Sequence, residues 1–145
     1  GSMASKPTLA LRQPLNAPPG KVFEAWTKRE KMIRWWGVTG HEKTPIAETD
    51  MRVGGRFRVQ FWAPDGEHHS VSGLYREIVP DRRLVFSWAW QSTPERQSQV
   101  TVDLKPDSDG TVLTLTHEQF VDEKARDDHR GGWSKALDSL ERLFA

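Results

Sequence analysis

Two histidines are the side chains in this sequence whose types and spacing best suit chemistry. His117 ends a run in which Leu113 and Leu115 occupy alternate positions, so a strand would turn its imidazole inward. His129 precedes Trp133 by one helical turn on an apolar stripe. An imidazole can act as a general acid or base near neutral pH, or anchor a ligand by a hydrogen bond. The alternative is a pair of structural imidazoles with partners inside the protein.

For two further polar residues, Tyr75 and Arg58, the alternation does not settle which face of the sheet they occupy. Tyr75 is the only tyrosine, and it either donates a hydrogen bond to a carbonyl or phenol in a cavity or simply covers the sheet. Arg58 is expected on the solvent face, because Phe57 and Val59 claim the inner one. A bulge near Gly54-Gly55 would instead turn Arg58 inward as a carboxylate anchor.

No motif for metal binding, phosphate binding or covalent catalysis is found. His68 and His69 are adjacent, so on a strand they point to opposite faces, and neither His41 nor His117 has a second histidine four residues on. The absence of cysteine excludes disulfides, thiolate zinc sites and cysteine nucleophiles. We therefore expect no metal and no cofactor, and we assign no catalytic residue.

Seven tryptophans beside six phenylalanines form the most unusual feature of the composition. Tryptophan is large, is rarely buried completely, and carries one N–H that needs a partner, so this number suggests a cavity or an interface as well as a core. Trp35 and Trp36 are adjacent, and one indole can cap the core while the other faces a loop or a pocket mouth; both can equally be core and cap without a ligand.

The elements that must position these residues follow from hydrophobic periodicity. Residues 9–15 alternate as a strand, and helical spacing follows over residues 18–27. Thr27 and Glu30 form a capping-box pair that predicts a second short helix, closed by Gly37. From residue 45, alternation broken by turn signals predicts about six antiparallel strands. Residues 122–144 form one long amphipathic helix. The class is α+β, and a sheet facing one helix leaves a gap to be filled or occupied.

Charge and length restrict the partners. Lys and Arg number 21 against 20 Asp and Glu, a formal net charge of +1, so we expect no nucleic-acid partner. No apolar run is long enough for a membrane span, and we expect a cytoplasmic protein. Residues 4–145 are expected to form a single domain, with residues 1–3 a cloning remnant and initiator Met.

Several short motifs in order along the chain resemble the bacterial family named after the C-terminal domain of the Hsp90 ATPase activator. They include Arg34-Trp35-Trp36-Gly37, Gly54-Gly55-Arg56-Phe57, Pro64-Asp65-Gly66, Gly110-Thr111 followed by Leu113, Leu115 and His117, and His129 followed by Gly132-Trp133. The resemblance implies a helix-grip fold, as in the START and birch-pollen-allergen superfamily. In that fold a curved antiparallel sheet of six to seven strands wraps around the C-terminal helix, after two short helices, and often encloses an apolar cavity.

The sequence and the resemblance together favour binding of a small hydrophobic or aromatic molecule between the sheet and the C-terminal helix. The residues expected to contact the ligand are Trp36, Phe57, Phe61, Tyr75, Phe86, Trp88, His117, His129 and Trp133. One alternative is an enzyme similar to polyketide cyclases and aromatases, which hold a reactive chain in the cavity; the sequence leaves turnover open but favours binding. Another is a protein-interaction module resembling a co-chaperone. A homodimer is compatible with exposed sheet or aromatic surface.

Overall fold

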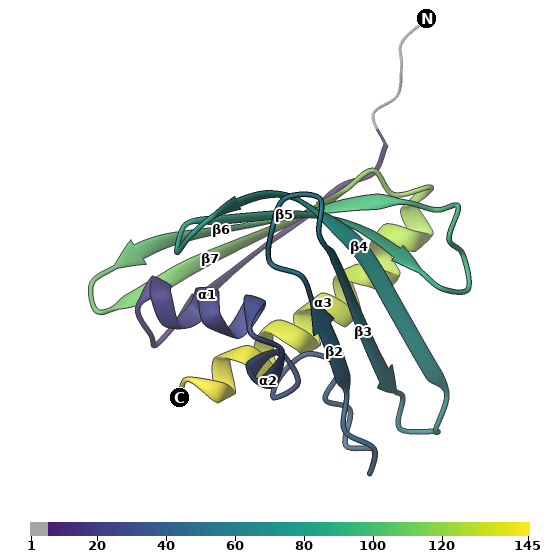
Figure 1. The fold of residues 1–145 in the computed structure, drawn as a ribbon, viewed down its shortest axis with the longest axis horizontal. Coiled ribbons are helices and arrows are strands. Elements are labelled where there is room, and N and C mark those ends of the chain that lie inside the picture. The colour runs from purple at the N-terminus through teal and green to yellow at the C-terminus, as the bar shows by residue number, and fades with distance from the viewer. Residues whose placement is uncertain (1–5) are drawn as a thin grey trace, which may run out of the picture.

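The computed structural model describes residues 6–145, and the predicted cloning remnant at residues 1–3 lies outside them. The elements follow one another in the predicted order (Figure 1): β1 (Leu9–Leu15), α1 (Pro19–Thr27), α2 (Arg29–Met32), β2 (Ile46–Thr49), β3 (Arg56–Trp62), β4 (His68–Val79), β5 (Arg83–Trp90), β6 (Ser98–Asp107), β7 (Gly110–Glu118) and α3 (Glu123–Leu143). The long helix begins at Asp122, whose side chain accepts a hydrogen bond from the Ala125 N–H.

The strands form one curved antiparallel sheet in the order β1-β7-β6-β5-β4-β3-β2. The first and last strands of the chain are neighbours, and residues 9–15 of β1 pair with residues 111–117 of β7. Helix α3 crosses the sheet, and α1 and α2 lie toward the end where the chain terminates (Figure 1). Trp133, Leu137 and Leu140 are the buried residues of α3 and join the hydrophobic core. The predicted α+β helix-grip architecture is therefore confirmed.

The alternation expected from the sequence decides which side chains face the core. His117 is fully buried, together with Leu113 and Leu115 on the same face of β7. Phe57 and Val59 are buried in β3, whereas Arg58 points to the other face and donates from Nε to Ser70 Oγ at 3.1 Å. The register shift in the β3–β4–β5 region lies in β4 after Tyr75, so no bulge turns Arg58 inward.

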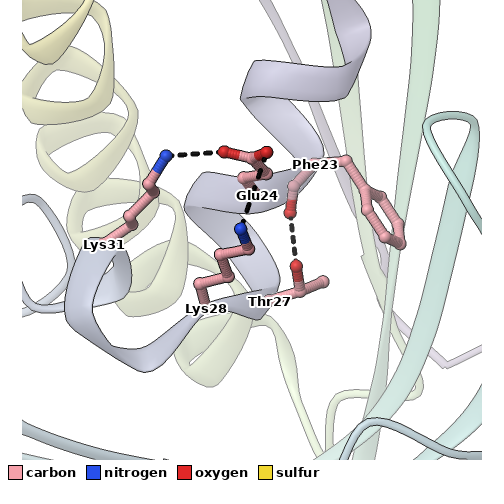
Figure 2. Close-up of polar contacts among 5 residues, drawn as sticks. All are labelled: Phe23, Glu24, Thr27, Lys28 and Lys31. Carbon is pink, nitrogen blue, oxygen red and sulfur yellow. Dashed lines mark hydrogen bonds and ion pairs between the residues drawn. The ribbon is translucent and has the colours of Figure 1, made fainter.

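The predicted capping box at Thr27 and Glu30 is wrong. Thr27 ends α1 instead of starting α2, because its hydroxyl donates to the Phe23 carbonyl one turn earlier, at 2.8 Å (Figure 2). The residue preceding α2 is Lys28, whose side chain makes no capping bond. Figure 2 also shows Lys28 and Lys31 on either side of the Glu24 carboxylate, and these ion pairs lower the pKa of Glu24.

The early end of α2 at Met32 leaves both adjacent tryptophans in the turn that follows it. Both are buried, and the Trp35 indole donates to the Ala25 carbonyl at 2.8 Å, which ties this turn to α1. Gly37 ends the turn with a φ of 73°, a conformation that costs glycine little. The prediction that Gly37 closes the second helix is wrong, because α2 already ends at Met32; Gly37 closes the turn that follows it, and this turn presents Trp36 to the sheet.

Gly73 in β4 lets the backbone of β5 approach closely at Ser87, and we expect Gly73→Ala to destabilise the protein by roughly 2–4 kcal/mol. A Cβ at this position would overlap the Ser87 carbonyl oxygen and lie 2.7 Å from Phe57 Cε1. Urea unfolding measures the effect. Gly131→Ala in α3 is the control, because nothing lies within 4 Å of its Cβ position; it should gain about 0.5–1 kcal/mol. Equal stabilities of the two variants would contradict the close approach.

Candidate functional site

A cavity of about 820 Å³ lies between α3, the turn after α2, and the ends of β3, β4 and β5. Its wall is mainly aromatic, and its mouth reaches solvent where Val38, Lys135 and Arg142 are exposed. Its lining includes Gly132 on α3 and the side chains of Trp36, Phe61, Trp88, Trp90, His129 and Trp133. A volume of this size is within the range of cavities that hold small organic molecules.

Four indoles from three parts of the chain form the inner wall. The rings of Trp36 and Trp88 are parallel, with an interplanar angle of 3° and centroids 5.8 Å apart. The ring centroid of Trp133, on α3, lies 5.0 Å from that of Trp88. The Trp90 ring is perpendicular to the Trp88 ring, with centroids 5.5 Å apart. Because offset-stacked and edge-to-face pairs are the favourable arrangements of aromatic rings, contacts within the protein stabilise this wall.

Glycine shapes the cavity at two positions. A Cβ on Gly37 would lie 2.7 Å from Phe61 Cβ, so only glycine allows the turn after α2 to close against β3. Gly132 differs, because nothing in the protein lies within 4 Å of its Cβ position. Glycine within a helix costs about 1 kcal/mol relative to alanine, and packing inside this chain does not require it at Gly132. Its effect is to leave the α3 backbone bare on the cavity wall.

His117 lies behind this wall in a closed chain of hydrogen bonds. The Trp133 indole donates from Nε1 to His117 Nδ1 at 2.9 Å, so Nδ1 carries no proton. The proton is therefore on Nε2, which donates to Ser98 Oγ at 2.7 Å. The Ser98 hydroxyl in turn donates to the Trp88 carbonyl at 3.4 Å. Burial, with a smaller contribution from His129, lowers the pKa of His117 to about 2, so the imidazole is neutral.

His129 forms the opposite tautomer. Its Nδ1–H donates to the Ala125 carbonyl at 2.7 Å, and its Nε2 accepts from the Trp90 indole at 2.9 Å. Burial lowers the pKa of His129 and outweighs the hydrogen bond to the Ala125 carbonyl, which raises it. The two imidazole centroids are 5.1 Å apart, and all four ring nitrogens have protein partners. This geometry favours the structural alternative: each imidazole orients a tryptophan of the cavity wall.

A second, smaller cavity of about 190 Å³ lies on the other side of Trp90 and His129. The two cavities share Trp88, Trp90, Asp128 and His129 as lining residues. The hydrogen bond from Trp90 to His129 is therefore part of the partition between them.

Five of the nine residues expected at the ligand line the main cavity, namely Trp36, Phe61, Trp88, His129 and Trp133. The other four, Phe57, Tyr75, Phe86 and His117, do not line it and are at most 3% exposed in the core. Burial raises the pKa of Tyr75, whose ring packs against Phe57 and Phe86. These four residues miss the cavity because of their position along the strands. Alternation places them on the inner face of the sheet, but α1 covers one end of that face, where Trp26 contacts Phe86.

Trp90, His69 and Gly132 are parts of the wall that were not expected from the sequence. Trp90 was identifiable, because it continues the alternation of Phe86 and Trp88 on β5. His69 lies 5.3 Å from the Phe61 ring and 6.1 Å from Trp90, a cross-strand proximity that needs the register. Within residues 6–145, no three His, Asp or Glu side chains gather as a metal site requires, and no helix has the length and apolar composition to cross a membrane.

Acidification should destabilise the native protein through His129. Its pKa lies below the ordinary value of 6.5 in the folded state, so below that pH the unfolded chain takes up a proton that the folded protein excludes. This contribution to stability is present above pH 6.5 and is lost as the pH falls. We expect His129→Gln to reduce the pH dependence between pH 6.5 and 5 by up to about 1.4 kcal/mol per pH unit, measured by urea unfolding.

His68→Gln, at an exposed position on β4, controls for the substitution itself. Carboxylate titration is common to all three proteins and cancels in the comparison. Parallel stability curves for the wild type and His129→Gln would contradict a buried neutral imidazole.

Comparison with known proteins connects this architecture to a family. The family model described as "Activator of Hsp90 ATPase homolog 1-like protein" matches residues 16–145. A solved structure from Rhizobium leguminosarum is 30% identical with a TM-score of 0.79, and covers 95% of this chain and 93% of the other. A protein from Chromobacterium violaceum is 27% identical with a TM-score of 0.80, over 95% and 97% of the two chains.

CalU16 from Micromonospora echinospora is also similar, at 30% identity and a TM-score of 0.73, over 95% of this chain and 76% of its own. Among curated proteins nothing matches. The family shares its fold with the START and polyketide cyclase superfamily, whose members commonly bind hydrophobic ligands. The sheet wrapped around α3 and the match over most of its length identify this chain as a member of the Hsp90 ATPase activator homolog 1-like family.

Proposed function

We propose that this protein binds a small hydrophobic or aromatic molecule in the main cavity. The observation that carries the proposal is a space of about 820 Å³ that remains open between α3 and the sheet although it is walled by indoles. Apolar surface facing water costs roughly 25 cal/mol per Å², so a ligand that covers these rings is stabilised by the same effect that folds the protein.

The rigidity of the wall supports this proposal. Trp90 and Trp133 cannot rotate freely, because their indole N–H groups are bound to His129 and His117. Trp36 is held by stacking on Trp88 and by the turn that Gly37 closes. A wall already ordered before binding loses little side-chain entropy when a ligand arrives, which raises affinity.

Gly132 is the second supporting feature. It lies on the cavity wall with open space where a side chain would be, so a planar molecule can approach the α3 backbone. The opposite wall is formed by aromatic rings, which accept a planar ligand by stacking. The proposed ligand therefore lies between the bare helix surface and the tryptophans.

The hydrogen bonding of the two histidines favours binding over turnover. Each ring nitrogen of His117 and His129 already has a protein partner, and neither imidazole has a free lone pair for a substrate proton. The residues proposed to contact the ligand are Trp36, Phe61, Trp88, Trp90, His129, Gly132 and Trp133.

A large side chain that projects into the cavity from α3 should weaken binding without unfolding the protein. We expect Gly132→Leu to weaken binding of the neutral fluorescent probe N-phenyl-1-naphthylamine at least about tenfold, a loss of about 1.4 kcal/mol, because the leucine occupies the ligand's space. Fluorescence titration measures the affinity, and thermal unfolding measures stability.

The adjacent Gly131→Leu is the matched control, because Gly131 has the same helical context and equally open surroundings but does not line the cavity. It should bind the probe like the wild type. Equal probe affinity in both variants, or no binding by the wild type of this probe and of a panel of aromatic and aliphatic compounds, would overturn the proposed function.

A further inference from the structure

The mouth of the main cavity carries unpaired positive charge. Five ionisable side chains line this cavity: His69, Asp128, His129, Lys135 and Arg142. The only acidic one, Asp128, is paired with Lys124, its oxygen 3.0 Å from the ammonium nitrogen. Within the described chain, neither Lys135 nor Arg142 makes a side-chain hydrogen bond or an ion pair. The mouth therefore has two free cations and no free carboxylate on its lining.

Helix geometry places these two cations on one side of α3. Positions seven apart are separated by almost two full turns, so Lys135 and Arg142 project from the same face, about 10 Å apart along the axis. Gly132 and Ala136 line the cavity from the same region of the helix and are small. A molecule lying on the bare helix surface can therefore extend from the tryptophans toward either cation.

Nearby carboxylates form no ion pair with these two cations. Glu141 accepts a hydrogen bond from Gln13 Nε2 at 2.6 Å, which directs it toward β1. Asp138 lies on the same face of α3, three positions after Lys135 and four before Arg142, but it is exposed, forms no ion pair with either and does not line the cavity. The net charge of the whole chain is only +1, so a preference for anions at this mouth has to come from these local groups and not from the overall field.

We propose that the ligand is an amphipathic organic anion: an aromatic or apolar body inside the cavity, with a carboxylate or a similar acidic group at Lys135 and Arg142. The proposal rests on the proposed binding function and specifies its ligand class. A guanidinium can bind a carboxylate with two parallel hydrogen bonds, and an ammonium adds a mobile point charge, so the pair suits acids of different lengths.

Two related probes separate the charge from the apolar body. N-phenyl-1-naphthylamine is neutral, and 1-anilinonaphthalene-8-sulfonate has the same rings with an added sulfonate. At low salt we expect the wild type to bind the sulfonate probe about tenfold more tightly than the neutral one. The double variant Lys135→Gln/Arg142→Gln should remove this preference and change the affinity for the neutral probe less than about twofold.

The matched control is Lys105→Gln/Arg130→Gln, which removes the same charge from exposed residues of β6 and α3 that do not line the cavity. It should keep the preference for the sulfonate probe. If the neutral probe binds but the wild type shows no preference, or if the Lys135/Arg142 variant retains it, the anion site is wrong and the binding function stands. If neither probe binds, or Gly132→Leu leaves both affinities unchanged, both proposals fail.

Discussion

Two hydrogen bonds between indoles and imidazoles hold α3 against the sheet, and the site depends on them. Trp133 donates to His117 across from α3 to β7, and Trp90 donates to His129 from β5 back to α3. Each bond requires a ring nitrogen without a proton, so each histidine has to be neutral. Burial favours the neutral form, and the remaining nitrogens are held by Ser98 and the Ala125 carbonyl. The consequence is a rigid wall of tryptophan rings.

The interior between helix and sheet is divided into a filled part and an open part. Near α1, Trp26 packs against Trp35 and Phe86, and the core there is complete. Farther along β5, Trp88 packs against Trp133 and Trp90 bonds to His129, but the space between these rings, the turn after α2 and Gly132 remains open. A larger side chain at Gly132 would take up part of this space, because nothing obstructs a Cβ there. An open space next to such an accessible position is consistent with a cavity that is used.

The similar structures identify the fold of this protein but not its ligand. Solved structures at 27% and 30% identity share the sheet and helix over almost the whole chain, so the fold belongs to the family. Ligand choice depends on side chains that line the cavity and its mouth, since function resides in the site and not in the fold. In this chain those side chains combine an aromatic interior with two cations that form no ion pair, and the proposed ligand class rests on this combination.

Much of the fold could be predicted from the sequence, because periodicity and turn residues are local signals. Alternation placed His117 inward, helical spacing placed Trp133 and Leu137 on the buried face of α3, and the family motifs indicated the helix-grip fold. The local pattern gave a wrong prediction at Thr27, whose hydroxyl donates to the Phe23 carbonyl of α1 and does not cap α2. Alternation also could not say how far along a strand a residue lies from α1, so Phe57 and Trp88 looked equivalent although only Trp88 reaches the cavity. The tautomers, the paired and unpaired charges and the open space were decided by tertiary structure, because each depends on groups brought together from distant parts of the chain.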